Sequence, residues 1–125
     1  MLPVWRLITS KSPASAIPVA ISPAPASLDE ASRHLPSGAY TTLRTYSYQN
    51  VIRLSKHLAR LRESAILKGY DIAIDEKRIR EAIRWVLGQV ENEQEYRLRL
   101  TLDLSREPGS MYLSIELLHA LLDGQ

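Results

Sequence analysis

A strict alternation of apolar and polar residues in the segment YRLRLTLDL, residues 96–104, is the strongest constraint on the fold. Its apolar members are Tyr96, Leu98, Leu100, Leu102 and Leu104. A period of two is typical of β-strands and places these side chains on one side of the chain. The segment therefore predicts a strand with one buried face and one polar face. The turn signal Pro108-Gly109 follows, and residues 111–117 are predicted to return as the partner strand.

A second hairpin is predicted earlier in the chain. Residues 38–46 are rich in threonine and tyrosine, which favour strands. Residues 47–50 are polar, and residues 51–54 resume an extended pattern. This spacing predicts a hairpin with a loop of about four residues.

Two helices are predicted between the hairpins. The first spans residues 56–68, with Ser55 as its N-cap and Gly69 as a left-handed residue at its end. Its buried stripe consists of Leu54, Leu58, Leu61 and Ala65. Asp75 is the predicted cap of the second helix, whose apolar face is Ile79, Ile83, Val86, Leu87 and Val90. The order of elements predicts an α+β fold, an antiparallel sheet of two hairpins with two helices packed on one face.

The N-terminal part of the chain has a different character. Residues 10–27 combine proline, serine and small residues, which predict an irregular arm with one short edge strand at residues 17–21. A tail without fixed structure is the alternative. Ser27 begins a short helix before Pro36, with Glu30 at the capping-box position.

The residue types present exclude several kinds of chemistry. The chain has no cysteine, which excludes disulfides, thiolate nucleophiles and cysteine-bound zinc. The three histidines, His34, His57 and His119, have no partner at metal-ligand spacing, so we expect no metal site. No apolar run approaches the roughly 20 residues that span a bilayer, so we expect a cytoplasmic protein without a membrane partner.

Nucleic-acid binding is a further alternative, because arginines gather in residues 53–62 and 78–84. The net charge is only +2, few aromatic residues lie among these arginines, and Glu63 and Glu81 dilute the positive charge. We therefore expect no nucleic-acid partner.

Three groups of residues match a known family in order along the chain. They are Gly38, Tyr40, Thr42 and Arg44 in the first strand, His57, Arg60 and Leu61 in the first helix, and Arg97 and Arg99 in the alternating strand. With these residues, the segment 27–117 resembles the N-terminal small domain of the class IV (fold type IV) pyridoxal-phosphate enzymes. This family includes branched-chain and D-amino-acid aminotransferases and 4-amino-4-deoxychorismate lyase. The Thr-Leu-Arg sequence at residues 42–44 is more similar to the lyase and D-amino-acid branch.

The resemblance implies that Arg60 binds the phosphate of pyridoxal 5′-phosphate. A guanidinium group suits this role because it binds phosphate oxygens through paired, charge-assisted hydrogen bonds. The alternative is a solvated helix arginine whose stem covers apolar surface. His57 is expected to anchor the start of the helix by a hydrogen bond rather than to act as a base.

The same matching implies that Arg44, Arg99 and Tyr40 face the substrate, where the two arginines bind a carboxylate. Arg97 lies in phase with Arg99 and is the alternative to it. The competing interpretation is that these arginines form the solvated face of a half-exposed strand.

The chain departs from the family at several positions. Leu35-Pro36 stands where the family often has Tyr-Gly, and Tyr40-Thr41 stands where it has Phe-Glu. These departures leave the substrate class open. The short N-terminal strand of the family, with its Asn-Gly turn, is not expected here.

The family's Schiff-base lysine belongs to a second, larger domain that follows the small one. The lysines of this chain, Lys11, Lys56, Lys68 and Lys77, lie in other segments and lack the apolar or cationic setting of a nucleophilic lysine. We therefore expect an arm at residues 1–26, a small domain at residues 27–125 without the lysine-bearing domain, and no catalytic residue in this chain.

The resemblance leaves transamination and lyase chemistry both open. It implies an amino-acid or aminodeoxychorismate-like substrate in the intact enzyme, and a homodimer. A non-catalytic interaction module that keeps the fold is the alternative function. The apolar segment at residues 117–122 predicts exposed hydrophobic surface and self-association.

Overall fold

The computed structural model describes residues 2–46, 50–90 and 95–118. Within these ranges the chain forms a six-stranded antiparallel sheet with the strand order β2-β1-β6-β5-β3-β4. In chain order the elements are β1 (Val4–Ile8), β2 (Ser15–Pro18), α1 (Leu28–Arg33), β3 (Gly38–Tyr46), β4 (Asn50–Val51), α2 (Leu54–Leu67), α3 (Glu76–Leu87), β5 (Tyr96–Asp103) and β6 (Met111–Leu117).

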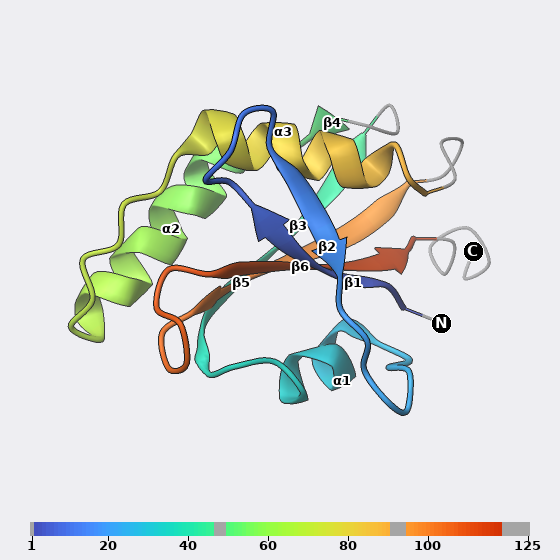
Figure 1. Cartoon of the computed structure of the whole chain (residues 1–125), viewed down its shortest axis with the longest axis horizontal. Coiled ribbons are helices and arrows are strands. Elements are labelled where there is room, and N and C mark those ends of the chain that lie inside the picture. Colours follow the sequence, from blue (N-terminus) through green and yellow to red (C-terminus); the bar gives the residue numbers. More distant parts are fainter. Residues whose placement is uncertain (1, 47–49, 91–94, 119–125) are drawn as a thin grey trace.

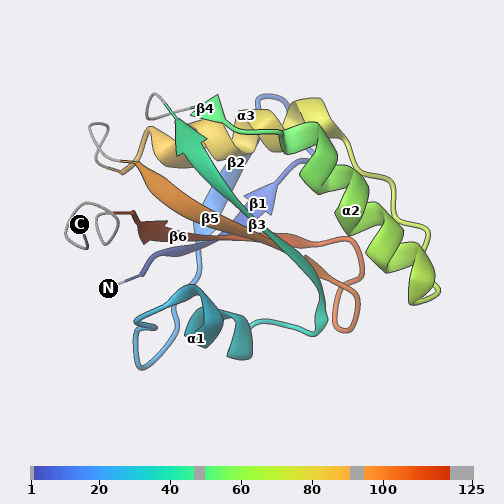
Figure 2. The same ribbon diagram turned by 180° about the vertical axis from the view of Figure 1, so that it is seen from behind.

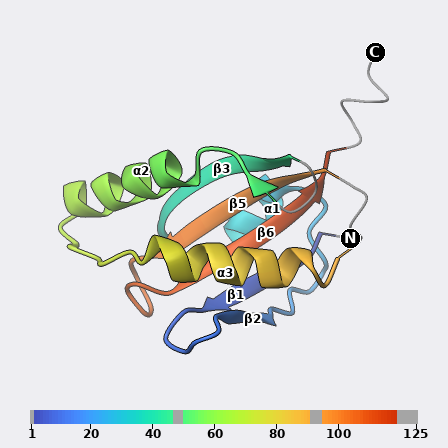
Figure 3. The same ribbon diagram turned by 90° about the horizontal axis from the view of Figure 1, so that it is seen from above.

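Helices lie on both faces of this sheet (Figures 1 and 2). On one face α2 lies over β3 and α3 lies over β1 and β2 (Figure 3). The larger hydrophobic core lies between these two helices and the sheet. The opposite face carries α1 and is called the α1 face below; a smaller apolar cluster packs there. The predicted α+β fold, with two helices on one face of an antiparallel sheet, is confirmed.

The alternating strand has the predicted buried face. Leu98, Leu100 and Leu102 are fully buried on the side of α2 and α3. The prediction that the other side is solvated is wrong for most of the strand, because Arg99, Thr101 and Asp103 are also buried. The packing of α1 and the turn after β5 covers this side, and Arg97 alone of the four polar residues is exposed.

The buried carboxylate of Asp103, on the polar side of β5, is stabilised by hydrogen bonds. It accepts hydrogen bonds from the backbone N–H groups of Ser105, Arg106 and Glu107. Burial acts to raise the pKa of Asp103, but these hydrogen bonds outweigh burial and hold the pKa below its ordinary value of 3.8. The carboxylate therefore stabilises the turn between β5 and β6.

The helix α2 buries the predicted stripe of Leu54, Leu58, Leu61 and Ala65. The predicted N-cap is wrong, because the helix begins at Leu54 with Arg53 as N-cap, at φ 55°. The Ser55 hydroxyl instead donates to Glu76 Oε2 at 2.7 Å, which joins α2 to α3.

The other three predicted helix signals are confirmed. Gly69 has a φ of 90°, the left-handed conformation expected after the end of α2. Asp75 caps α3 by accepting a hydrogen bond from the backbone N–H of Arg78. The short helix predicted from Ser27 is α1, and the Ser27 hydroxyl accepts from the backbone N–H of Glu30.

The N-terminal residues belong to the sheet. The strand β1, which was not expected from the sequence, lies between β2 and β6, and the Ile115 N–H donates to the Pro3 carbonyl. The predicted edge strand is present as β2, two residues earlier than expected. Apolar Val4 and Leu7 are buried on opposite sides of β1, so burial on both faces of the sheet fixes this strand.

The first predicted hairpin is shorter than expected. Its second strand, β4, spans only Asn50–Val51, because Leu54 belongs to α2. Gly38 begins β3 at a point where β3 and β5 approach closely. A Cβ atom at this position would collide with the Leu102 carbonyl of β5. Residues 47–49 of the predicted loop and residues 119–122 of the predicted apolar segment at residues 117–122 lie outside the described residues.

Candidate functional site

The predicted substrate residues form rows across the α1 face. In one row Arg44 of β3 lies opposite Arg97 of β5, which lies opposite Glu116 of β6. Opposed residues of antiparallel strands point to the same face, and like charges in direct opposition are unfavourable. Arg97 Nη1 lies 3.6 Å from Glu116 Oε2, whereas Arg44 has no ion-pair or hydrogen-bond partner among the described residues. This row therefore presents an uncompensated positive charge.

The neighbouring row contains Arg99, which is held inside the protein. Its Nη1 donates to Asp29 Oδ1 at 2.9 Å and to the Ser32 hydroxyl at 3.0 Å, both on α1. Its Nε donates to Thr42 Oγ1 at 3.1 Å. The guanidinium also lies 4.4 Å from the centre of the Tyr40 ring. Arg99 therefore joins α1 to the sheet, and its side chain is only 11% exposed.

A hollow of about 300 Å³ lies at the β3 edge of the sheet and is called the edge hollow below. Its lining residues are Thr42, Leu43, Arg44, Ile52, His57, Arg97 and Leu118. It brings together predicted residues from three groups that are far apart in the sequence. No carboxylate lines it among the described residues, so it is the more positive part of the site.

A second hollow, of about 310 Å³, lies between α1 and the sheet and is called the α1 hollow. Its lining residues are Ser27, Leu28, Asp29, Thr42, Arg97, Arg99 and Glu116. Thr42 and Arg97 line both hollows, so the two form neighbouring parts of one groove. Two arginines and two carboxylates line the α1 hollow, so its charges balance.

His57 anchors the start of α2, as predicted. Its Nδ1 lies 2.7 Å from Thr41 Oγ1, which points to the α2 side of β3. Burial, then the positive charges of Arg60 and Arg53, lower the pKa of His57 below its ordinary value of 6.5. The ring is therefore neutral at pH 7 and forms a hydrogen bond without adding charge.

Arg60 lies one helical turn beyond His57 in α2 and is exposed. Among the described residues it has no hydrogen-bond or ion-pair partner. Its charge acts on His57, which lines the edge hollow. The neighbouring Arg62, in contrast, lies 3.5 Å from Asp71. Arg60 therefore keeps all its donors available.

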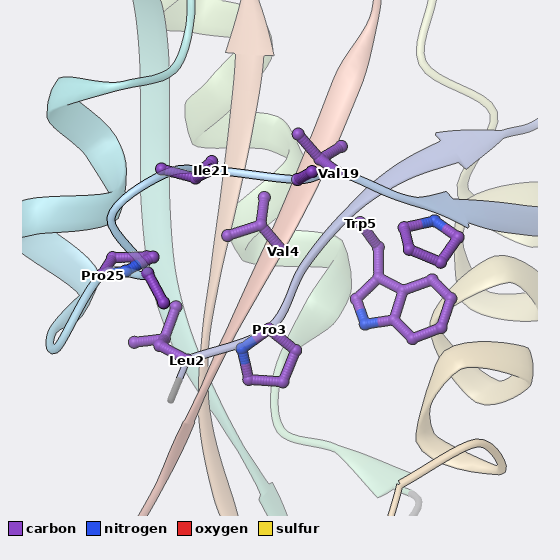
Figure 4. Close-up of a pocket in the computed structure, with 10 residues that line it drawn as sticks. Leu2, Pro3, Val4, Trp5, Val19, Ile21 and Pro25 are labelled. Atoms are coloured by element: carbon purple, nitrogen blue, oxygen red, sulfur yellow. The ribbon is translucent and has the colours of Figure 1, made fainter.

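A third hollow, of about 350 Å³, is lined by Leu2, Pro3, Val4, Trp5 and Pro18, and by Val19, Ala20, Ile21, Ala24 and Pro25. Figure 4 shows its labelled side chains arranged as a ring between β1 and the segment after β2. None of the predicted site residues lines it, and its lining contains no charged side chain. It therefore lacks the groups that bind phosphate or carboxylate.

The four lysines are all exposed. Lys68 Nζ donates to the Gly38 carbonyl at 3.1 Å. None of the four lines the edge hollow or the α1 hollow. The arrangement of the described residues can therefore bind anions, but it brings no amine to the groove.

Three groove and anchor residues are not predicted by the sequence: Asp29, Thr41 and Glu116. Asp29 lies between Ser27 and Glu30 of the capping signal, which assigns it no role, and Thr41 stands out in the sequence only as a departure from the family. Glu116 lies opposite Arg97 because of the register between β5 and β6. The length of the turn between these two strands does not by itself predict that register.

The fold matches a solved structure of a larger protein. This is a protein of Thermotoga maritima assigned as a branched-chain amino acid aminotransferase, with a TM-score of 0.62 and 17% sequence identity. The match covers 92% of the present chain and 37% of that chain, so the present chain spans little more than a third of its length. No curated protein matches the sequence.

The family model of the class IV aminotransferases matches residues 38–121. This segment contains all three groups of residues that carry the resemblance. The chain belongs to the class IV aminotransferase family. No helix among the described residues is long and apolar enough to cross a membrane.

Proposed function

We propose that this chain is the small domain of a pyridoxal-phosphate-dependent class IV enzyme, with the groove formed by the edge hollow and the α1 hollow as its ligand-facing surface. The observation that carries the proposal is the edge hollow, where Arg44, Arg97 and His57 converge from β3, β5 and α2. In this role the domain binds and orients ligands. The lysine that holds the cofactor covalently belongs to the larger domain of the family and is not assigned to this chain.

Arg60 is the proposed phosphate ligand. The residues present fit this group, because Arg60 has no partner among the described residues and neutral His57 lies one turn away. A guanidinium binds phosphate oxygens in pairs and stays charged at any working pH. When bound, pyridoxal phosphate supplies the electron sink for chemistry at the amino acid's α-carbon.

Arg44 and Arg97 are the proposed carboxylate ligands. Both line the edge hollow, and the like-charged pair gains most from an anion placed between its members. Arg99 and Tyr40 are the proposed further substrate contacts, from the neighbouring rows. Hydrogen bonds to Asp29, Ser32 and Thr42 orient Arg99 there. The groove suits an amino-acid or aminodeoxychorismate-like substrate, and it does not decide between amino transfer and lyase chemistry.

Phosphate binding is tested with pyridoxine 5′-phosphate, which lacks the aldehyde and cannot react with lysines, and with pyridoxine as the phosphate-free control. Both are titrated into the 125-residue chain, and dissociation constants are measured from amide chemical shifts. Only the phosphorylated compound should bind measurably. Arg60→Gln should weaken that binding about fivefold, the loss expected for one exposed charge-assisted contact.

The matched control is Arg62→Gln, which removes the same charge two residues away in α2, where Arg62 already pairs with Asp71. Its dissociation constant should stay close to that of the unmodified chain. Equal effects of the two substitutions would remove Arg60 from the phosphate site. Equal binding of both compounds would favour the alternative function, a non-catalytic interaction module.

A further inference from the structure

Glu116 is the one carboxylate in the row that contains the proposed carboxylate ligands. It lies directly opposite Arg97 on β6, and its side chain is 29% exposed. The distance of 3.6 Å between Arg97 Nη1 and Glu116 Oε2 exceeds that of a hydrogen bond. Glu116 therefore acts on Arg97 through charge while the guanidinium donors remain available to a ligand.

The position of Glu116 makes the two hollows of the groove differ in charge. It lines the α1 hollow, with Asp29, and is absent from the lining of the edge hollow. An anion in the edge hollow meets Arg44 and Arg97, with no carboxylate among the described lining residues. An anion in the α1 hollow meets Arg97 and Arg99 but also Asp29 and Glu116, and the Nε and Nη1 of Arg99 already donate within the protein.

We propose that Glu116 is a charge-selectivity residue, which confines carboxylate ligands to the edge hollow and lowers their affinity there. This proposal rests on the proposed function, because it assumes that Arg44 and Arg97 bind a carboxylate. A ligand carboxylate competes with Glu116 for Arg97, so the site disfavours small, singly charged acids. Ligands with two acidic groups, or with a further contact to another part of the enzyme, compete more effectively.

The experiment titrates malonate, a small dicarboxylate, into the 125-residue chain and into Glu116→Gln, followed by amide chemical shifts at constant ionic strength. Removing the competing charge should lower the malonate dissociation constant about three- to fivefold, the range of a partly exposed ion pair. In Glu116→Gln, new shift changes should also appear at residues 27–29, which line the α1 hollow. The amide spectrum itself shows whether the variant is folded.

The matched control is Glu107→Gln, which removes the same charge from an exposed carboxylate that pairs with Arg6 on another part of the surface. It should leave the malonate affinity unchanged. Equal effects of Glu116→Gln and Glu107→Gln would overturn the selectivity proposal.

Arg97→Gln separates this proposal from the proposed function. It should weaken malonate binding, and adding Glu116→Gln to it should then have little effect. If Arg97→Gln weakens binding while Glu116→Gln does not strengthen it, the selectivity proposal fails and the carboxylate assignment stands. If malonate binds none of the variants, both fail, whereas the phosphate role of Arg60 is judged by its own experiment.

Discussion

Thr41 Oγ1 and His57 Nδ1 lie 2.7 Å apart and join the middle of β3 to the first turn of α2. This contact holds the first turn of α2 against β3, where His57 lines the edge hollow. Arg60 lies one helical turn further along α2. Of the side chains proposed to bind anions, Arg44 lies on β3 and Arg60 on α2, whereas Arg97 lies on β5.

Replacing Thr41 with valine should destabilise the protein. Valine keeps the shape of the side chain but leaves His57 Nδ1 without its partner, so the free energy of unfolding should fall by about 1 kcal/mol. Urea denaturation measures this difference.

The control is Thr101→Val, because Thr101 Oγ1 is buried without a hydrogen-bond partner among the described residues. Removing an unpaired hydroxyl should leave the free energy of unfolding unchanged or raise it. A larger loss in Thr101→Val than in Thr41→Val would contradict the role given to the Thr41–His57 contact.

His57 makes stability depend on pH. Its pKa is lowered below 6.5 in the folded protein, by burial first and then by Arg60 and Arg53. As the pH falls through 6.5, the unfolded chain takes up a proton at this position before the folded chain does. The His57 contribution to the free energy of unfolding is therefore complete above pH 6.5 and is lost as the pH falls toward the folded pKa.

Arg60→Gln should raise the pKa of His57 toward 6.5, because it removes one of the two positive charges that disfavour the imidazolium. A ring-proton NMR titration measures this pKa, and a His57→Gln spectrum identifies the resonance. An unchanged pKa in Arg60→Gln would show that the Arg60 side chain points away from the edge hollow.

Arg99→Lys should loosen α1. Lysine keeps the charge but cannot reproduce the set of bonds from Nε and Nη1 to Thr42, Asp29 and Ser32. The free energy of unfolding should fall by about 1 to 2 kcal/mol. Hydrogen exchange of residues 28–33 should accelerate more than that of α3.

Arg97→Lys is the comparison for this change, since Arg97 is exposed and only loosely paired with Glu116. Its effect on the free energy of unfolding should stay within about 0.5 kcal/mol. If the two substitutions destabilise the protein equally, Arg99 does not hold α1 to the sheet.

Pyridoxal 5′-phosphate should form no selective covalent adduct with this chain. All four lysines are exposed, and none lines the groove, so none is placed for attack on a bound cofactor. Borohydride reduction followed by peptide mass spectrometry should find no preferred lysine. A stable, stoichiometric adduct at one of Lys11, Lys56, Lys68 or Lys77 would contradict this.

Periodicity predicted the elements with strong patterns. The alternation of residues 96–104 and the stripe from Leu54 to Ala65 each predict a buried apolar face, and both apolar faces are confirmed, although the polar face of the strand is also mostly buried. The strand β1 was missed because it is buried on both sides, so its five residues do not alternate clearly. The N-cap of α2 was misplaced because Ser55 forms its hydrogen bond with Glu76 of α3, a tertiary contact that local sequence does not show.

The candidate site was predicted in its residue types more than in its arrangement. Arg44, Arg97, His57 and Arg60 came from the family resemblance, and the structure brings the first three to one hollow. The roles of Arg97 and Arg99 could not be separated in the sequence, because the two residues have the same phase on one strand. The position of α1, which pairs Asp29 with Arg99, distinguishes them.

We propose that the start of α2, beside the β3 edge of the sheet, binds the phosphate of the cofactor through Arg60. The most direct test of this proposal is a map of amide chemical-shift changes caused by pyridoxine 5′-phosphate, after subtraction of those caused by pyridoxine. We expect the phosphate-dependent changes to concentrate at residues 43–44 and 57–61. Changes concentrated instead around Trp5 and the apolar hollow of Figure 4, or along α3, would contradict it.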